Sequence, residues 1–373
     1  MKVAILTIRI HSNFGYIMQL YALQKAIDKI GHDAYTIQLK LEPMTIKQRI
    51  KYFAKIFVLK YIMRRQPSPI YKYPTKRQME YMDANTWDFI SHHCKLTRYF
   101  PSIEKLSELA NEYDVFVVGS DQVWRHEYSA DIPTYFFSFL PDGKKRIAYA
   151  ASFGISENDY GEDLTQICKS LLNKFSAVGV REKTAVKLCD EVFDIKAEQV
   201  LDPTLLLTKE DYQHLIEVDK IGEVPTSPFL LLYVLDTAPE KFELAKKIAD
   251  ERRLVIFQIK PSDFREVGAR HIDECIYPHI STWLYAFNHA SYVITDSFHG
   301  TVFSIIFEKA FLTFGNKKRG LDRMATLLEM CNLKERLYDE TFLDKDIAYD
   351  MVFSKLKEER VKSLRFLKTN LQS

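Results

Sequence analysis

Glycine is scarce in this sequence, which contains only 12 glycines in 373 residues. Average usage is roughly 7%, so the chain has less than half the usual share. The remaining composition, with 47% hydrophobic, 13% aromatic and 27% charged residues, is that of a globular protein. It excludes a disordered chain, a collagen-like repeat and a small disulfide scaffold. We therefore expect each glycine to lie where the backbone turns sharply or approaches a ligand closely.

Paired cysteines and secretion signals are also missing. The five cysteines are widely spaced without a C-x-x-C pair, and no N-x-S/T glycosylation sequence occurs. No apolar run approaches the roughly 18 residues of a membrane-spanning helix, and residues 1–8 lack the apolar core of a signal peptide. His92 and His93 precede Cys94, but no fourth ligand is near, so we predict no metal site. These absences predict a reduced, soluble, cytoplasmic protein.

A net charge of one sign is missing as well. The 52 basic and 50 acidic residues leave a formal charge of +2, which gives no reason to expect a nucleic-acid partner. Ten basic residues and no acidic one nevertheless lie between Pro43 and Met79. Within this stretch, the apolar spacing of residues 46–65 predicts an amphipathic helix. We favour a helix packed on its own domain with a solvated basic edge; the alternative is peripheral contact with the inner face of a membrane or with a glycan.

Strand-like and helix-like segments alternate along the chain, and a length of 373 residues exceeds the roughly 250–300 at which one core stops growing. We predict strands at residues 3–10, 34–39, 114–118, 146–151, 177–180, 200–201, 229–235, 254–259, 292–294 and 311–314. Helices are predicted after a polar turn at 11–15 and up to residue 30, and at 239–252, 281–288 and 301–307. The pattern indicates an α/β protein with two Rossmann-like domains facing a cleft, at residues 1–219 and 220–373. The C-terminal helix is a candidate for packing back on the first domain.

Polar motifs follow several of the predicted strands. They are Asn13-Phe14-Gly15, Gln19 with Tyr21-Ala22-Leu23-Gln24, Val118-Gly119-Ser120-Asp121-Gln122-Val123-Trp124, Tyr149-Ala150-Ala151-Ser152-Phe153-Gly154, Val180-Arg181-Glu182-Lys183, Leu201-Asp202-Pro203-Thr204 and Thr295-Asp296-Ser297-Phe298-His299-Gly300-Thr301. In this order, across roughly residues 1–335, they resemble the polysaccharide pyruvyl transferase family.

The resemblance implies a GT-B-like fold of two Rossmann domains, with the acceptor on the first and the donor on the second. It also implies transfer of an enolpyruvyl unit from phosphoenolpyruvate to a sugar hydroxyl of a cell-surface polysaccharide or its precursor, giving a pyruvate ketal. The expected partners are then phosphoenolpyruvate and a glycan or lipid-linked saccharide. No separate cofactor is required.

His299 is the candidate acid for this chemistry, because the methylene carbon of phosphoenolpyruvate must receive a proton and histidine is a common donor near neutral pH. It follows a predicted strand and precedes a predicted helix. A helix N-terminus attracts anions, so a bound phosphate there would favour the charged ring. The competing interpretation is that His299 caps the helix or packs beneath it.

Four further residues at predicted strand ends are candidates. Arg181 either grips the donor, as the resemblance implies, or pairs with Glu182 on the surface. Asp121 either accepts a proton from the acceptor hydroxyl or caps a helix after it. Asn13 and Gly15 either bind substrate or only form a turn.

Ser297 marks a departure from the family pattern. Several members carry an arginine two residues before the histidine that helps to hold the donor, and here Ser297 stands in its place among the substrate-binding candidates. Lys260, Arg319 and Arg323 are candidates to supply the missing charge, although the basic run around Arg319 is also consistent with a solvated surface. The other possibility is a donor different from phosphoenolpyruvate. Asp296 either orients His299 or fixes the loop.

Two alternative functions stay open. One is a GT-B glycosyltransferase that uses a nucleotide sugar, although no E-x7-E pair occurs from Ile294 onward. The other is a catalytically silent glycan-binding relative, which the departure at Ser297 would favour. On all three interpretations the scarce glycines cluster at the cleft: we place Gly15, Gly119, Gly154, Gly179 and Gly300 in turns bordering it.

Overall fold

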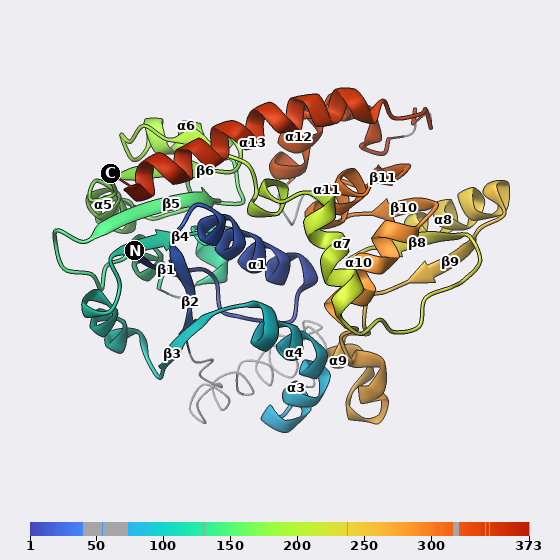
Figure 1. The fold of residues 1–373 in the computed structure, drawn as a ribbon, viewed down its shortest axis with the longest axis horizontal. Coiled ribbons are helices and arrows are strands. Elements are labelled where there is room, and N and C mark those ends of the chain that lie inside the picture. Colours follow the sequence, from blue (N-terminus) through green and yellow to red (C-terminus); the bar gives the residue numbers. More distant parts are fainter. Residues whose placement is uncertain are drawn as a thin grey trace.

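The computed structural model of the chain describes residues 1–39, 54, 74–129, 131–236, 238–315, 321–339, 341–342 and 344–372. These residues form two α/β units, each built on a parallel sheet with helices around it (Figure 1). This arrangement confirms the predicted fold class. Apart from Ala54, the amphipathic helix predicted at 46–65 lies outside the described residues.

The first sheet has seven strands in the order β3-β2-β1-β4-β5-β6-β7. Their bounds are β1 (Lys2–Leu6), β2 (Asp33–Leu39), β3 (Leu96–Phe100), β4 (Val115–Val118), β5 (Lys145–Ala151), β6 (Ala177–Val180) and β7 (Glu198–Gln199). The chain first winds outward from β1 through β2 and β3, and then returns to pair β4 with β1 on its other side. The topological switch therefore lies between β1 and β4, and a ligand cleft is expected beyond their carboxyl ends.

The second sheet repeats this arrangement with four strands in the order β11-β10-β8-β9. The bounds are β8 (Phe229–Tyr233), β9 (Val255–Gln258), β10 (Tyr292–Thr295) and β11 (Phe311–Thr313). Its switch lies between β8 and β10, which pair in parallel. Both β8 and β10 are buried along their whole length. Their nearly continuous apolar sequences are typical of parallel strands that are buried on both faces.

The helices cover the sheets and connect the strands. They are α1 (Phe14–Lys29), α3 (Lys76–Met82), α4 (Ala84–His93), α5 (Glu162–Leu172), α6 (Lys183–Glu191), α7 (Lys209–Val218), α8 (Pro239–Arg252), α9 (Phe264–Val267), α10 (Ile280–His289), α11 (Phe298–Ile306), α12 (Leu321–Met330) and α13 (Tyr349–Gln372). None of the helices among the described residues combines the length and apolar character that a membrane crossing needs.

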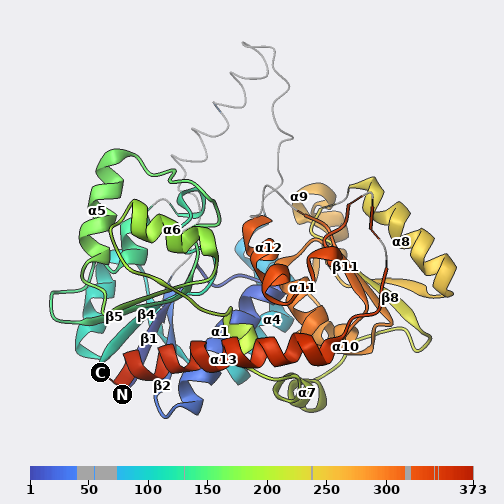
Figure 2. The same cartoon turned by 90° about the horizontal axis from the view of Figure 1, so that it is seen from above.

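Two helices tie the units together. In α7, the Tyr212 ring meets the Phe303 ring of α11 edge-on, with centroids 4.9 Å apart. Helix α13 runs along both units (Figure 2), and the Oγ atom of its Ser363 accepts a hydrogen bond of 2.9 Å from the Leu201 backbone N–H. The C-terminal helix thus packs against the first sheet. The domain boundary at residue 219 stays a prediction.

Several local expectations need correction. Gly179 lies inside β6 rather than in a turn at the cleft, and a Cβ atom there would lie 3.0 Å from the Phe366 ring of α13. This glycine therefore allows the C-terminal helix to approach the sheet. Strand β7 ends before Val200, and β3 was not predicted. Helix α11 begins at Phe298, so His299 lies within its first turn.

Candidate active site

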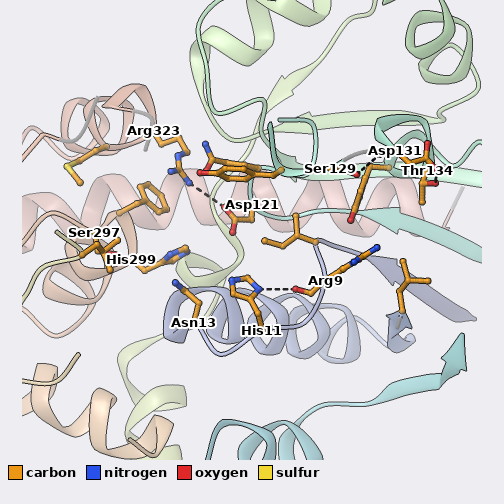
Figure 3. Close-up of a pocket in the computed structure, with 18 of the residues that line it drawn as sticks. Arg9, His11, Asn13, Asp121, Ser129, Asp131, Thr134, Ser297, His299 and Arg323 are labelled. Carbon is orange, nitrogen blue, oxygen red and sulfur yellow. Dashed lines mark hydrogen bonds and ion pairs between the residues drawn. The ribbon is translucent and has the colours of Figure 1, made fainter. Parts of the chain in front are cut away.

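A cavity of about 640 Å³ lies where the two topological switches face each other (Figure 3). Its wall combines residues that follow β1 and β4 with residues that follow β8 and β10. Among the lining residues are Arg9, His11, Asn13, Asp121, Tyr128, Asp131, Thr134, Ser297, Phe298, His299 and Arg323. The structure therefore brings His299, Asp121, Asn13, Ser297 and Arg323 to one cavity.

His299 is held by contacts from the first unit. Its side chain is 9% exposed, and its Nε2 atom lies 2.6 Å from Nε2 of Gln19 on α1. The ring packs so closely on Gly15 that a Cβ atom at that position would lie 2.2 Å from His299 Nδ1. Gly15 therefore serves to admit the imidazole, which is a role that turn chemistry alone does not predict.

Ser297 caps α11. Its side-chain oxygen accepts a hydrogen bond of 3.3 Å from the Gly300 backbone N–H, which satisfies one of the N–H groups that have no partner within the helix. An arginine cannot accept this bond. The residue that replaces the family's arginine thus shapes the first turn of α11 while still lining the cavity.

Arg181 lines a second cavity of about 320 Å³, which Phe298 also lines. Its Nη1 atom donates a hydrogen bond of 2.8 Å to Asp202, and its guanidinium lies 4.9 Å from the centroid of the Phe298 ring. Burial lowers the pKa of Arg181, but Asp202, Asp121 and Glu182 outweigh it and raise the pKa overall. Arg181 is therefore a buried, ion-paired residue rather than the surface partner of Glu182.

Asp121 bridges two guanidinium groups. Its Oδ1 atom lies 3.5 Å from Arg181 Nη2 and 3.4 Å from Arg323 Nη1. Burial would raise the pKa of this carboxyl, but Arg181, Arg323 and His299 lower it below the ordinary value. A turn and not a helix follows Asp121, so its side chain caps no helix there. It is an ionised carboxylate that balances charge at the cavity wall.

Arg323 approaches the same place from α12. It is 8% exposed, and its guanidinium lies 5.6 Å from the centroid of the Phe298 ring. Burial and the repulsion of Arg181 lower its pKa to about 10, against the attraction of Asp121. The guanidinium is therefore still charged at neutral pH, and Arg323 lines the same cavity as His299.

Of the other predicted residues, Asn13 lines the same cavity, whereas Lys260 does not. Asn13 caps α1, because its Oδ1 atom accepts a hydrogen bond of 3.0 Å from the Tyr16 N–H. Lys260 donates to the Leu235 carbonyl and lines a separate cavity. Arg319 lies outside the described residues.

Asp296 fixes a loop. Its carboxylate accepts bonds from the Leu235 N–H at 2.6 Å and from the Lys241 ammonium at 2.6 Å. Of the two roles considered for this residue, the contacts therefore show loop anchoring. Among the described residues no three His, Cys, Asp or Glu side chains gather closely enough to hold a metal ion.

Gln19 and Asp202 are site residues to which sequence analysis assigned no role. Both belong to the quoted motifs, and both are nearly fully buried. One sequence feature could have indicated a role for Gln19. In α1 it is flanked by Met18 and Leu20 in an otherwise apolar run. A polar side chain on a buried helix face needs a partner, but the sequence does not show which one.

Comparison with known proteins supplies a family. The family model described as polysaccharide pyruvyl transferase matches residues 13–318 of this chain. Comparison with curated proteins found no significant match.

Several solved structures are similar to this chain over most of its length, but their sequence identity to it is low. An alpha-glucosyltransferase in complex with UDP has 10% identity and a TM-score of 0.47, over 98% of this chain and 95% of the other. The UDP-GlcNAc 2-epimerase of Neisseria meningitidis has 10% identity and a TM-score of 0.46, over 96% and 100%. The MnaA protein of S. aureus, solved with UDP, has 14% identity and a TM-score of 0.48, over 96% and 87%.

Proposed function

This chain belongs to the polysaccharide pyruvyl transferase family, and from that premise we propose that it transfers an enolpyruvyl unit from phosphoenolpyruvate to a sugar hydroxyl. The product is a pyruvate ketal on a cell-surface polysaccharide or its precursor. The observation that carries the proposal is the meeting of His299 and Arg323 at one cavity between the two units.

Arg323 and the first turn of α11 form the donor side. Phosphoenolpyruvate carries a phosphate and a carboxylate, and a planar guanidinium binds either group with two parallel hydrogen bonds. The N-terminus of a helix adds backbone N–H groups and a favourable dipole for an anion. Arg323 thus restores, from α12, the charge that Ser297 removes from the position two residues before His299.

His299 supplies the proton in this proposal. The proton adds to the methylene carbon, the acceptor oxygen bonds to C2, and the bond between C2 and the phosphate oxygen breaks. A second hydroxyl of the acceptor then closes the ketal. Of the two protons that the hydroxyls lose, one replaces the proton delivered to the new methyl group and the other leaves with the phosphate. Asp121 stays a candidate for accepting a hydroxyl proton, although its lowered pKa makes it a weak base.

The acceptor side is the half of the cavity formed by the first unit. Arg9 and His11 follow β1, and Asp131 and Thr134 face them across the cavity (Figure 3). Tyr128 also lines the cavity. The Tyr128 ring is half exposed, and the Arg125 guanidinium lies 4.7 Å from its centroid. An exposed ring beside hydroxyl and carboxylate groups is suited to a saccharide, which offers both apolar faces and hydroxyls.

We retain the prediction that the reaction takes place in the cytoplasm. All five cysteines are free thiols, as expected of a protein in a reducing compartment.

Phosphate release tests the proposal. Wild-type protein, phosphoenolpyruvate and a panel of glycans should release phosphate with at least one acceptor. His299→Ala should reduce that release by a factor of about 10² to 10⁴, the usual contribution of a general acid. His289→Ala, at an exposed position on α10, is the matched control and should keep full activity. Equal release by the His299 variant and the control would refute the assigned role.

A further inference from the structure

Gln19 lies between the candidate acid and a buried carboxylate. Its side chain is on α1 in the first unit, and the residue is 3% exposed. The Nε2 atom lies 2.8 Å from Asp202 Oδ2 and 2.6 Å from His299 Nε2. The Oε1 atom of the same amide is buried without a hydrogen-bond partner in the described structure. One amide nitrogen therefore serves two neighbours.

Asp202 determines which end of the amide faces these neighbours. Its Oδ1 atom accepts bonds from the backbone N–H and the hydroxyl of Thr204, at 3.0 and 2.6 Å, and its Oδ2 atom accepts from Arg181 at 2.8 Å. Burial would raise the pKa of this carboxyl, but the charged form of His299 and, without it, Arg181 and Thr204 act to hold the pKa below the ordinary value. Asp202 is thus ionised and only accepts hydrogen bonds.

The orientation of the Gln19 amide then determines which nitrogen of His299 accepts a hydrogen bond. Rotating the Gln19 amide would place Oε1 against a carboxylate oxygen, and two acceptors would meet without a hydrogen between them. The NH₂ group therefore stays on this side, with one hydrogen for Asp202 and one for His299. A ring nitrogen that accepts a hydrogen bond carries no proton, so the proton of the neutral ring is on the other nitrogen.

We infer that Gln19 is a positioning residue that holds neutral His299 with Nε2 unprotonated and the proton on Nδ1. Gly15 leaves room for the ring in this orientation, because a Cβ atom at that position would lie 2.2 Å from Nδ1. Nδ1 is the ring nitrogen that Gln19 does not bind, and it carries the proton to be delivered. This catalytic part rests on the proposed function.

Nitrogen NMR of the imidazole ring tests the inference without any substrate. In the ligand-free full chain, at a pH where the ring is neutral, His299 should show a protonated Nδ1 and an unprotonated Nε2. In Gln19→Met, Nε2 loses its donor, and the proton should move to Nε2 and bond to Asp202. Gln19→Glu, which brings a carboxylate to the same place, should likewise give a protonated Nε2.

Gln24→Met is the matched control. Gln24 is another buried glutamine of α1, but its amide bonds to Thr36 and to the Lys95 carbonyl, so its loss should leave the His299 signals unchanged. A protonated Nε2 in the wild-type protein would overturn the inference, and this measurement suffices if the variants do not fold. Identical His299 signals in wild type and a folded Gln19→Met would also overturn it.

Activity separates this inference from the proposed function. Phosphate release by Gln19→Met should show a kcat at least 10-fold below wild type with a KM for phosphoenolpyruvate within 3-fold of it, because donor binding is intact. If the predicted tautomer is found but wild-type protein does not react with phosphoenolpyruvate, the proposed function fails while the role of Gln19 in orienting the ring stands.

Discussion

At the scale of single residues, the central feature is a cation that reaches the cavity from an unexpected element. Arg323 follows Ser297 by 26 positions in the sequence, yet both line the cavity of His299. The guanidinium lies over the Phe298 ring, which Arg181 also contacts. Arg181 repels the Arg323 guanidinium, and Asp121 offsets this repulsion only in part. An anion bound beside Arg323 would relieve that repulsion further.

We predict that Arg323→Met weakens phosphoenolpyruvate binding about 10- to 100-fold, since a hydrogen bond to a charged group contributes roughly 1.5–3 kcal/mol. Isothermal titration with wild type and variant measures the change. Arg98→Met removes an exposed arginine paired with Glu108 and Glu112 and serves as the control. Unchanged affinity in the Arg323 variant would move the donor site elsewhere.

Sequence reasoning placed His299, Asp121, Asn13 and Ser297 at one cavity because each of these four residues follows a predicted strand. Parallel strands bring their carboxyl ends to one edge of a sheet, so His299 and Asp121 could be assigned from the pattern alone. Lys260 also follows a strand, but β9 is the edge strand of its sheet and lies beyond the switch point. The pairing of Gln19 with His299, 280 positions apart, depends on how the two units dock.

At the scale of elements, the packing of α11 on β10 positions the acid. Gly300 lies in the first turn of α11, and a Cβ atom there would lie 2.1 Å from Thr295 Oγ1 on β10. The helix can therefore approach the strand only because this residue has no side chain. This close packing of α11 on β10 fixes the position of His299, the residue before Gly300, in the cavity wall.

Gly300→Val should consequently push α11 away from β10 and destabilise the protein by about 1–3 kcal/mol, the usual cost of overpacking. It should also weaken phosphoenolpyruvate binding. Gly222→Val is the control, because the nearest atom to a Cβ atom there is Thr282 Oγ1 at 3.4 Å. Urea unfolding of both variants measures the difference. Equal stability of the two variants would contradict the close packing of α11 on β10 at Gly300.

The same scale shows where periodicity is informative. Continuous apolar runs predicted β4, β8 and β10, because these central strands are buried on both faces. Strand β3 was missed because Arg98 and Tyr99 on it are exposed at the sheet edge, which breaks the apolar run. Strand β7 has two residues, both exposed, and so small an element leaves no periodic signal.

At the scale of the whole molecule, ionised carboxylates buried between the units connect stability to pH. Burial would raise the pKa values of Asp202 and Asp121, but the surrounding cations lower both below the ordinary value of 3.8. Below about pH 4 the unfolded chain therefore takes up protons before the folded chain does. The stability that these groups contribute is complete at neutral pH and is lost as the pH falls through their folded pKa values.

We predict that Asp202→Asn reduces the loss of stability between pH 7 and pH 3 by about 1 kcal/mol, because at pH 3 the unfolded carboxyl, with its ordinary pKa of 3.8, is mostly protonated whereas the folded one is not. The measurement compares urea unfolding at pH 7 and pH 3 for wild type, for Asp202→Asn and for the control Asp159→Asn, which changes an exposed side chain. The Asp202 variant should be less stable at pH 7 but lose less between the two values. An unchanged difference would contradict the low pKa.

Thermal unfolding with candidate donors is the most direct measurement of the central claim, that the cavity binds phosphoenolpyruvate. A ligand at 100 times its Kd stabilises the native state by about 2.7 kcal/mol. Phosphoenolpyruvate should therefore raise the Tm of wild-type protein by several degrees and that of Arg323→Met by less, while UDP- and GDP-sugars leave both unchanged. A rise with a nucleotide sugar and none with phosphoenolpyruvate would contradict the account.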